Sequence, residues 1–250
     1  MTDEARPPAS SLKGRLADVF IPALVSGELE ALARRLGNRA TVDDPIYGRA
    51  SSLASLEPMI GKLGDWLAQH KTAYRHVYST TGVDRDASEG ILVMQQSGVT
   101  RELPVAVVAE RRRLREIELR VYYASEPSAK RKPRTQLVPP NPRAALPQQV
   151  QEALEALGRS AIDGMLVAFE VDAHVVDPSG TWHHKRDGAM GSYLSDLGNV
   201  DIQVAGAADD GRTCAVEATV SVGARKDAPA MFSFERSNSG LFKELRLYWD

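Results

Sequence analysis

The 250-residue sequence has a single cysteine, Cys214, and no excess of charge of either sign. One cysteine cannot form a disulfide within the chain. Lysine and arginine total 31 against 33 aspartate and glutamate, so the composition does not predict the basic face that nucleic acids and anionic membranes require. No apolar run spans a bilayer, and Met1 to Ser11 lacks the apolar stretch of a signal peptide. We therefore expect a cytoplasmic protein that binds neither nucleic acid nor membrane.

Several sequence motifs of known chemistry are also absent. The chain has no glycine-rich phosphate loop, no nucleophile elbow of the Gly-x-Ser-x-Gly type and no cysteine–histidine pair. Its histidines lack the spacing of a recognised metal site. We accordingly expect no cofactor and no metal. With 43% hydrophobic and 26% charged residues, the chain is a globular protein that is long enough for two small domains.

The sequence contains an internal repeat. Residues 118–123 read E-L-R-V-Y-Y and residues 244–250 read E-L-R-L-Y-W-D. Upstream of each copy lies an Asp-Pro pair, Asp44-Pro45 and Asp177-Pro178. A third pair of matching motifs, Ser26-Gly27 and Asp163-Gly164, is predicted to separate two helical segments in each half. The three motifs occur in the same order in both halves, which predicts two domains of one fold.

Between the repeats lies a segment rich in proline and basic residues. It predicts an extended, solvated linker, with a basic binding patch as the alternative. The predicted organisation is a first domain at 10–124, the linker at 125–147 and a second domain at 148–250. The charge run at 110–115 is predicted to cover a hairpin between two strands, and an acidic partner is the alternative.

Hydrophobic periodicity predicts three helices and then strands in each half. In the first half the helices are a segment around 12–24, then 28–36 and 53–69. The second half has the corresponding segments at 150–166, 165–169 and about 187–197. Alternation of period two follows at 103–109, 215–222 and 230–234. The pattern predicts an α+β fold with three N-terminal helices packed on one face of a curved antiparallel sheet in each domain.

The closing strand of each repeat has two different faces. Leu119, Val121 and Tyr123 share one face, and Glu118, Arg120 and Tyr122 share the other. The Glu/Arg/Tyr face has two interpretations. It is either a solvated surface with cross-strand charge pairs, or the contact between the two sheets. The second interpretation makes the chain a monomer that forms an intramolecular pseudo-dimer.

These features resemble the ketosteroid isomerase and SnoaL-like proteins of the nuclear transport factor 2-like superfamily. The resemblance covers nearly the whole chain as two tandem copies. It rests on the Ser26-Gly27-Glu28 turn, the strand-end Asp-Pro pairs and the closing Arg-x-Tyr-Tyr/Trp strand. It implies a cone-shaped, cystatin-like α+β barrel with an apolar pocket open at one end. Members include isomerases, polyketide cyclases, dehydratases, epoxide hydrolases and proteins with no known activity, so the fold does not identify the reaction.

The resemblance implies roles for Asp44 and Asp177. In ketosteroid isomerases the carboxylate before the proline is the general base, and both residues match that position. The oxyanion-hole tyrosine falls on Phe20 and Leu157, and its acidic partner falls near Ala106 and Ala230. Without these donors a dienolate has little stabilisation, which disfavours steroid isomerisation.

Other residues near the two Asp-Pro pairs are candidates for a ligand site. In the first half they are Phe20, Tyr47 and Trp66, which suit either an apolar cavity or a plain core. In the second half they are His174 and Trp182. His183 and His184 are expected to be solvated, and His174 is expected to point away from Asp177 because it lies on the opposite strand face.

Three functions remain open, and all of them leave the ligand unidentified. The favoured one is binding of an apolar small molecule without a reaction. The alternative is a cofactor-independent polyketide cyclase, isomerase or dehydratase with Asp44 or Asp177 as general acid or base. A further alternative is a polyether-type epoxide hydrolase, which requires carboxylate pairs. The candidate pairs are Asp44 with Glu57 or Asp65, and Asp177 with Asp187 or Asp196.

Overall fold

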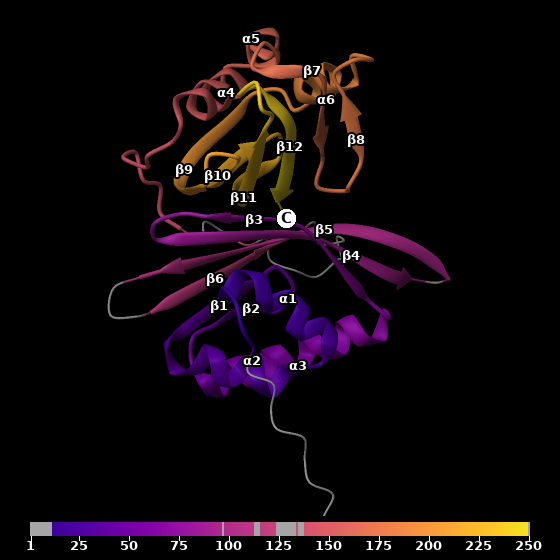
Figure 1. Ribbon diagram of the computed structural model, residues 1–250, viewed down its shortest axis with the longest axis vertical. Coiled ribbons are helices and arrows are strands. Elements are labelled where there is room, and N and C mark those ends of the chain that lie inside the picture. Colours follow the sequence, from indigo (N-terminus) through magenta and orange to yellow (C-terminus); the bar gives the residue numbers. More distant parts are fainter. Residues whose placement is uncertain (1–11, 97, 113–115, 124–133, 135–137, 250) are drawn as a thin grey trace, which may run out of the picture.

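The computed structural model contains two halves of the same architecture (Figure 1). It describes residues 12–96, 98–112, 116–123, 134 and 138–249. Most of the predicted linker and part of the charge run at 110–115 lie outside the described residues. The helices of the two halves lie on the outer sides of the molecule, and the two sheets face each other in the middle (Figure 1). No helix among the described residues is long and apolar enough to cross a membrane.

The first half has three α-helices and a six-stranded sheet. Its elements are α1 (Leu16–Ser26), α2 (Leu29–Leu36), η1 (Gly37–Arg39), β1 (Ala40–Asp44), β2 (Gly48–Ala50), α3 (Leu53–Gln69), β3 (Ala73–Thr81), β4 (Arg85–Gln96), β5 (Val99–Arg111) and β6 (Ile117–Tyr122). The strand order is β2-β1-β6-β5-β4-β3. The predicted bounds of α3 agree with the observed bounds.

The second half repeats this arrangement. Its elements are α4 (Gln148–Gly158), α5 (Ile162–Leu166), β7 (Phe169–Val176), β8 (Trp182–His184), α6 (Ala189–Asp196), β9 (Val200–Asp209), β10 (Thr213–Val222), β11 (Arg225–Arg236) and β12 (Phe242–Trp249). The strand order β8-β7-β12-β11-β10-β9 matches that of the first half. The predicted fold class, two tandem α+β domains, is confirmed.

The sheets are mixed, whereas the sequence pattern predicts antiparallel sheets. β1 pairs with β6 in parallel, and β7 pairs with β12 in parallel. The first strand of each half is separated from the last strand by most of the domain, so no tight turn forces an antiparallel pairing between them. The alternating pattern within each strand carries no information about the direction of its neighbour.

The turn after α1 is the one that the sequence predicts. Gly27 has φ = 76°, its N–H donates to the carbonyl of Leu24, and the N–H of Glu28 donates to Ala23. Glycine takes this left-handed conformation without strain. The matching prediction for Asp163-Gly164 is wrong, because both residues lie inside α5. The helix predicted over 165–169 is also displaced, since Phe169 begins β7.

Each half has its own apolar core between its helices and the inner face of its sheet. Phe20, Leu56 and Val121 belong to the first core, and Leu157, Phe232 and Leu247 belong to the second. The two residues at the positions of the oxyanion tyrosine, Phe20 and Leu157, are therefore core side chains.

The outer faces of the two sheets pack against each other. A third apolar cluster joins residues of both halves, among them Ala106, Tyr122, Met231 and Tyr248. This contact confirms the second interpretation of the repeated Glu/Arg/Tyr face. The surface that a free domain would expose is thereby buried within one chain.

Two buried glutamates connect the sheets. Glu217 on β10 accepts hydrogen bonds from Arg120 Nε (2.6 Å), Tyr122 Oη (2.6 Å) and Arg85 Nη1 (2.8 Å) of the first half. Burial opposes ionisation of Glu217, but the charge of Arg120 and its hydrogen bonds outweigh burial and lower the pKa of the carboxyl group. Gly206 on β9 makes room for this pair, because a side chain there would collide with the Arg85 guanidinium.

The reciprocal glutamate is Glu89 on β4. Its Oε2 accepts hydrogen bonds from Arg246 Nε (2.7 Å) and Tyr248 Oη (2.8 Å), and its Oε1 accepts one from Ser233 Oγ (2.7 Å). The Arg and Tyr of each closing strand thus clamp a glutamate of the other half. The repeat in the sequence corresponds to a pseudo-two-fold contact in the structure.

Candidate ligand-binding site

A cavity of about 580 Å³ lies at one end of the second half, beside Asp177. The end of β7, helix α6, the β10–β11 turn and the end of β12 surround it. Its lining residues are Asp177, Pro178, Ser179, Tyr193, Leu197, Val222, Ala224, Arg225 and Trp249. The volume falls within the range of small-molecule sites, and the pocket is widely open to solvent, so it would cover one side of a ligand and leave the other exposed.

Asp177 is held in a tight turn that follows β7. Its Oδ1 accepts hydrogen bonds from the N–H of Ser179 (2.8 Å), the hydroxyl of Ser179 (2.6 Å) and the N–H of Thr181 (3.0 Å). Partial burial opposes ionisation, but the hydrogen bonds from Ser179 and His183 outweigh it and lower the pKa of Asp177. The carboxylate is therefore ionised at neutral pH and is a weak base.

His183 is the second polar group at Asp177. Its Nε2 lies 3.0 Å from Oδ2 of Asp177, and its ring stacks on Tyr193 at 4.2 Å between centroids. An ionised carboxylate only accepts hydrogen bonds, so this contact requires a proton on Nε2. The expectation that His183 is solvated is wrong, because the β7–β8 turn brings it back to Asp177. His184 is exposed, as expected.

Two further polar side chains line the cavity. Within the described part of the chain, the hydroxyl of Tyr193 and the guanidinium of Arg225 have no hydrogen-bond or ion-pair partner. Burial, followed by the negative charge of Asp177, raises the pKa of Tyr193, so its hydroxyl stays protonated and can donate a hydrogen bond. Arg225 supplies a positive charge at the exposed side of the cavity.

The corresponding region of the first half is filled. Asp44 is 1% exposed and accepts hydrogen bonds from the N–H groups of Ile46 (2.7 Å) and Tyr47 (2.8 Å) and from Tyr123 Oη (3.1 Å). Tyr123 is buried and stacks on Trp66, with ring centroids 6.4 Å apart. Burial raises the pKa of Asp44 despite these hydrogen bonds. Tyr123 corresponds in the repeat to Trp249, which makes no such bond to Asp177.

The remaining predicted ligand residues lie at separate places. Phe20 is fully buried, Trp66 packs against the first core, and Tyr47 is 36% exposed. His174 and Trp182 do not line the cavity at Asp177. His174 on β7 and Trp182 on β8 stack on each other at 4.2 Å, and His174 Nε2 lies 3.5 Å from Glu244 Oε2.

Asp177 and Asp187, one of the predicted carboxylate pairs, accept their hydrogen bonds from separate donors in the described structure. Asp177 accepts hydrogen bonds from Ser179, Thr181 and His183, while Asp187 accepts one from the N–H of Ala189. Among the described residues, no group of three histidine, cysteine, aspartate or glutamate side chains is placed to hold a metal ion.

The two Asp-Pro aspartates are expected to respond to pH in opposite directions. The pKa of Asp44 is raised above its ordinary value of 3.8, so its contribution favours the folded state at low pH and is lost as pH rises through the raised pKa. The pKa of Asp177 is lowered, so its contribution is present above 3.8 and is lost as pH falls through the lowered pKa.

The measurement is the free energy of unfolding of the wild type and of Asp44→Asn and Asp177→Asn from about pH 3 to 8. As pH falls, the wild type should gain stability relative to Asp44→Asn and lose stability relative to Asp177→Asn. Two difference curves with the same sign of slope would contradict the described environments.

Comparisons with known proteins find similarity in structure alone. No protein-family model matches the chain, and no curated protein matches it. Among solved structures, a SnoaL-like protein of unknown function from Burkholderia thailandensis E264 is 11% identical, covers 42% of this chain and 99% of its own, and has a TM-score of 0.34. An NTF2-like protein of unknown function from Burkholderia pseudomallei K96243 is 19% identical. The match covers 41% of this chain and 88% of that protein, with a TM-score of 0.37.

A further match is an orange carotenoid protein from Anabaena (Nostoc) sp. PCC 7120, whose structure was solved with canthaxanthin bound. It is 15% identical, and the match covers 50% of this chain and 40% of that protein, with a TM-score of 0.38. The names of the SnoaL-like and NTF2-like neighbours are those of the superfamily that the sequence resembles. At identities of 11% to 19% these matches assign no activity to the chain.

Proposed function

We propose that the second domain binds an apolar small molecule that carries a carbonyl, hydroxyl or acidic group. The observation that carries this proposal is the cavity of about 580 Å³ beside Asp177, compared with the filled region around Asp44. The walls contributed by Leu197, Val222 and Trp249 suit an apolar body. The first domain then serves as the partner whose sheet covers the outer face of the second.

The polar groups of the cavity suggest how such a ligand would be oriented. The Tyr193 hydroxyl donates a hydrogen bond, and Arg225 attracts an oxygen that carries negative charge. On the other wall, Asp177 accepts hydrogen bonds. Because Ser179 and Thr181 fix its carboxylate, the ligand meets a preorganised acceptor and the cost of ordering it on binding is small.

The first test is a thermal-shift screen of the whole protein against apolar ketones, lactones, sterols, polyketide-like aromatics and epoxides. A ligand of the folded state raises the Tm in proportion to its occupancy. Val222→Trp places a large ring in the cavity and is expected to abolish the shift. Val99→Trp is the matched control, since Val99 is a strand valine of the first domain that is 60% exposed.

The expected result is a concentration-dependent shift for the wild type and Val99→Trp, and none for Val222→Trp. A shift that survives in Val222→Trp would place the ligand elsewhere. The absence of any shift up to the solubility limit would contradict the proposal.

A second candidate function is acid–base catalysis in the same cavity, favoured by the 3.0 Å contact between Asp177 and His183. Asp177 lines the cavity and would be the group that exchanges a proton with a ligand, although its lowered pKa makes it a weak base, and His183, which does not line the cavity, would position it through Nε2. For any panel compound that is converted, Asp177→Asn and His183→Gln should lower kcat by about 10²-fold or more. Unchanged turnover in both variants would rule out this role, while retained ligand binding in both would leave the binding function intact.

A further inference from the structure

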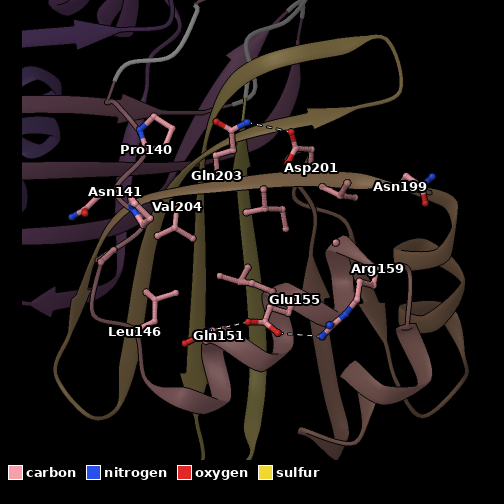
Figure 2. Close-up of a pocket in the computed structure, with 16 residues that line it drawn as sticks. Pro140, Asn141, Leu146, Gln151, Glu155, Arg159, Asn199, Asp201, Gln203 and Val204 are labelled. Atoms are coloured by element: carbon pink, nitrogen blue, oxygen red, sulfur yellow. Dashed lines mark hydrogen bonds and ion pairs between the residues drawn. The ribbon is translucent and has the colours of Figure 1, made fainter.

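A groove of about 850 Å³ runs along the outer strand of the second sheet, at a distance from the ligand cavity (Figure 2). One wall is strand β9, and the other is helix α4. The chain segment 140–146, which leads into α4, closes one end. None of these elements lines the cavity beside Asp177.

The groove follows the open edge of β9. In the described part of the sheet β9 is the terminal strand, with β10 as its only strand neighbour. Figure 2 shows Asp201 and Gln203 on one side of β9 and Val204 on the side that faces α4. Side chains from both faces of a strand line one groove only where the groove passes along the strand edge.

The chain itself already uses this edge for main-chain hydrogen bonding. The N–H of Asn141 donates to the carbonyl of Val204 at 2.7 Å. The next residue, Pro142, has no N–H, and the chain turns away through a bond from the Ala144 N–H to the Asn141 carbonyl (2.9 Å). The intramolecular segment therefore occupies the position at Val204, and Gly158 of α4 lies against the carbonyl of Val200, so among the described residues Ile202 is the edge position left between them.

The register of β9 defines the next position. The pairing with β10 is regular from Val204 to Val200, with Val204 opposite Ala218 and Ile202 opposite Val220. Main-chain groups of alternate residues point to the same edge of a strand. The N–H and carbonyl of Ile202 therefore point outward, as the carbonyl of Val204 does, into the groove.

The side chains along the groove differ on its two faces. Toward α4 the groove meets Leu146 and Leu154, which suit apolar side chains. On the opposite face, Asp201 is an exposed carboxylate that accepts a hydrogen bond from Gln203 Nε2 (3.3 Å). On α4, Glu155 is paired with Arg159 at 3.2 Å. The charged residues that line the groove are Asp201, Glu155 and Arg159, so the net charge of its lining is negative.

We propose that the groove binds an extended peptide segment of a partner protein, which adds a strand to β9. Its alternate residues are apolar toward α4 and basic toward Asp201. Main-chain hydrogen bonds to Ile202 supply the affinity that is independent of sequence, and the two faces select the alternating pattern. This inference is independent of the ligand cavity and of any reaction there.

The probe is the peptide acetyl-Lys-Val-Lys-Val-Lys-Val-Lys-amide, titrated into the whole protein by calorimetry. We expect saturable binding with a Kd below about 1 mM. Two further peptides have the same sequence with methylated main-chain nitrogens. In one of them all valines are N-methylated, and in the other all inner lysines are. Strand addition uses the N–H groups of only one alternate set, so one methylated peptide should lose at least tenfold in affinity and the other should bind as the parent does.

Asp201→Lys should weaken binding of the parent peptide severalfold at low salt, whereas Glu152→Lys should not. Glu152 is an exposed acid of α4 that does not line the groove. Equal binding of the two methylated peptides, or no binding of the parent, would overturn strand addition. A concentration-dependent dimer that the peptide dissociates would identify a second copy of the chain as the occupant and would overturn the proposed partner.

Discussion

Replacement of Glu217 by glutamine is expected to lower the free energy of unfolding by about 3 kcal/mol. The substitution keeps the size of the side chain and removes its charge. Arg120 and Arg85, whose side chains are 0% and 7% exposed, then lose the carboxylate that neutralises them. The loss of one partner of a buried ion pair costs about 3–5 kcal/mol, and the lower end applies because Glu110 and Glu118 still contact Arg120.

The matched control is Glu102→Gln. Glu102 also binds an arginine, Arg75, at 2.8 Å, but both side chains are more than half exposed. An exposed pair of this kind contributes at most about 1 kcal/mol. Urea unfolding of the three proteins measures the difference, and light scattering should give the mass of one chain for each. A loss for Glu217→Gln no larger than that for Glu102→Gln would contradict the described contact between the sheets.

Replacement of Tyr123 by alanine is expected to destabilise the protein by about 3–5 kcal/mol. Tyr123 is the side chain that fills the first domain between Trp66 and Asp44. The variant loses the buried ring, gains a cavity and leaves Oδ2 of Asp44 without the tyrosine hydroxyl. Because the cavity has the shape of the removed side chain, p-cresol should bind there and restore part of the lost stability.

Tyr123→Phe serves as the control, since it keeps the ring and removes only the hydrogen bond to Asp44. Its loss should be about 1.5–3 kcal/mol, and p-cresol should have no effect on it. Thermal unfolding with and without p-cresol is the measurement. A Tyr123→Ala protein as stable as wild type would show that the tyrosine does not fill this region.

The repeated closing strand allowed the fold to be predicted, and it left the contact between the sheets as one of two interpretations. Alternation separated Leu119 and Val121 from Arg120 and Tyr122, and the structure places the two sets in a core and in the interface respectively. Their glutamate partners could not be found in the same way. Glu89 and Glu217 lie at polar positions of their strands, which is also the pattern of a solvated glutamate, and only contact with the other half buries them.

The candidate site was predictable in part. The Asp-Pro pair located Asp177, because a carboxylate at a strand end is a feature of sequence order. His183 was assigned to solvent because a chain drawn as extended points adjacent histidines apart, whereas the turn around Asp177 returns it to the carboxylate. Tyr193 and Arg225 reach the cavity from α6 and the β10–β11 turn, and no local spacing connects these elements to Asp177.

The most direct test of the account uses tryptophan fluorescence, since the chain has three tryptophans at three distinct places. Trp249 lines the cavity of the second domain, Trp66 packs in the first domain, and Trp182 lies outside both. The panel compound with the largest thermal shift is titrated into Trp66→Phe, Trp182→Phe and Trp249→Phe. The account predicts that the binding signal is lost only in Trp249→Phe. A signal that is lost in Trp66→Phe and kept in Trp249→Phe would place the ligand in the first domain and contradict it.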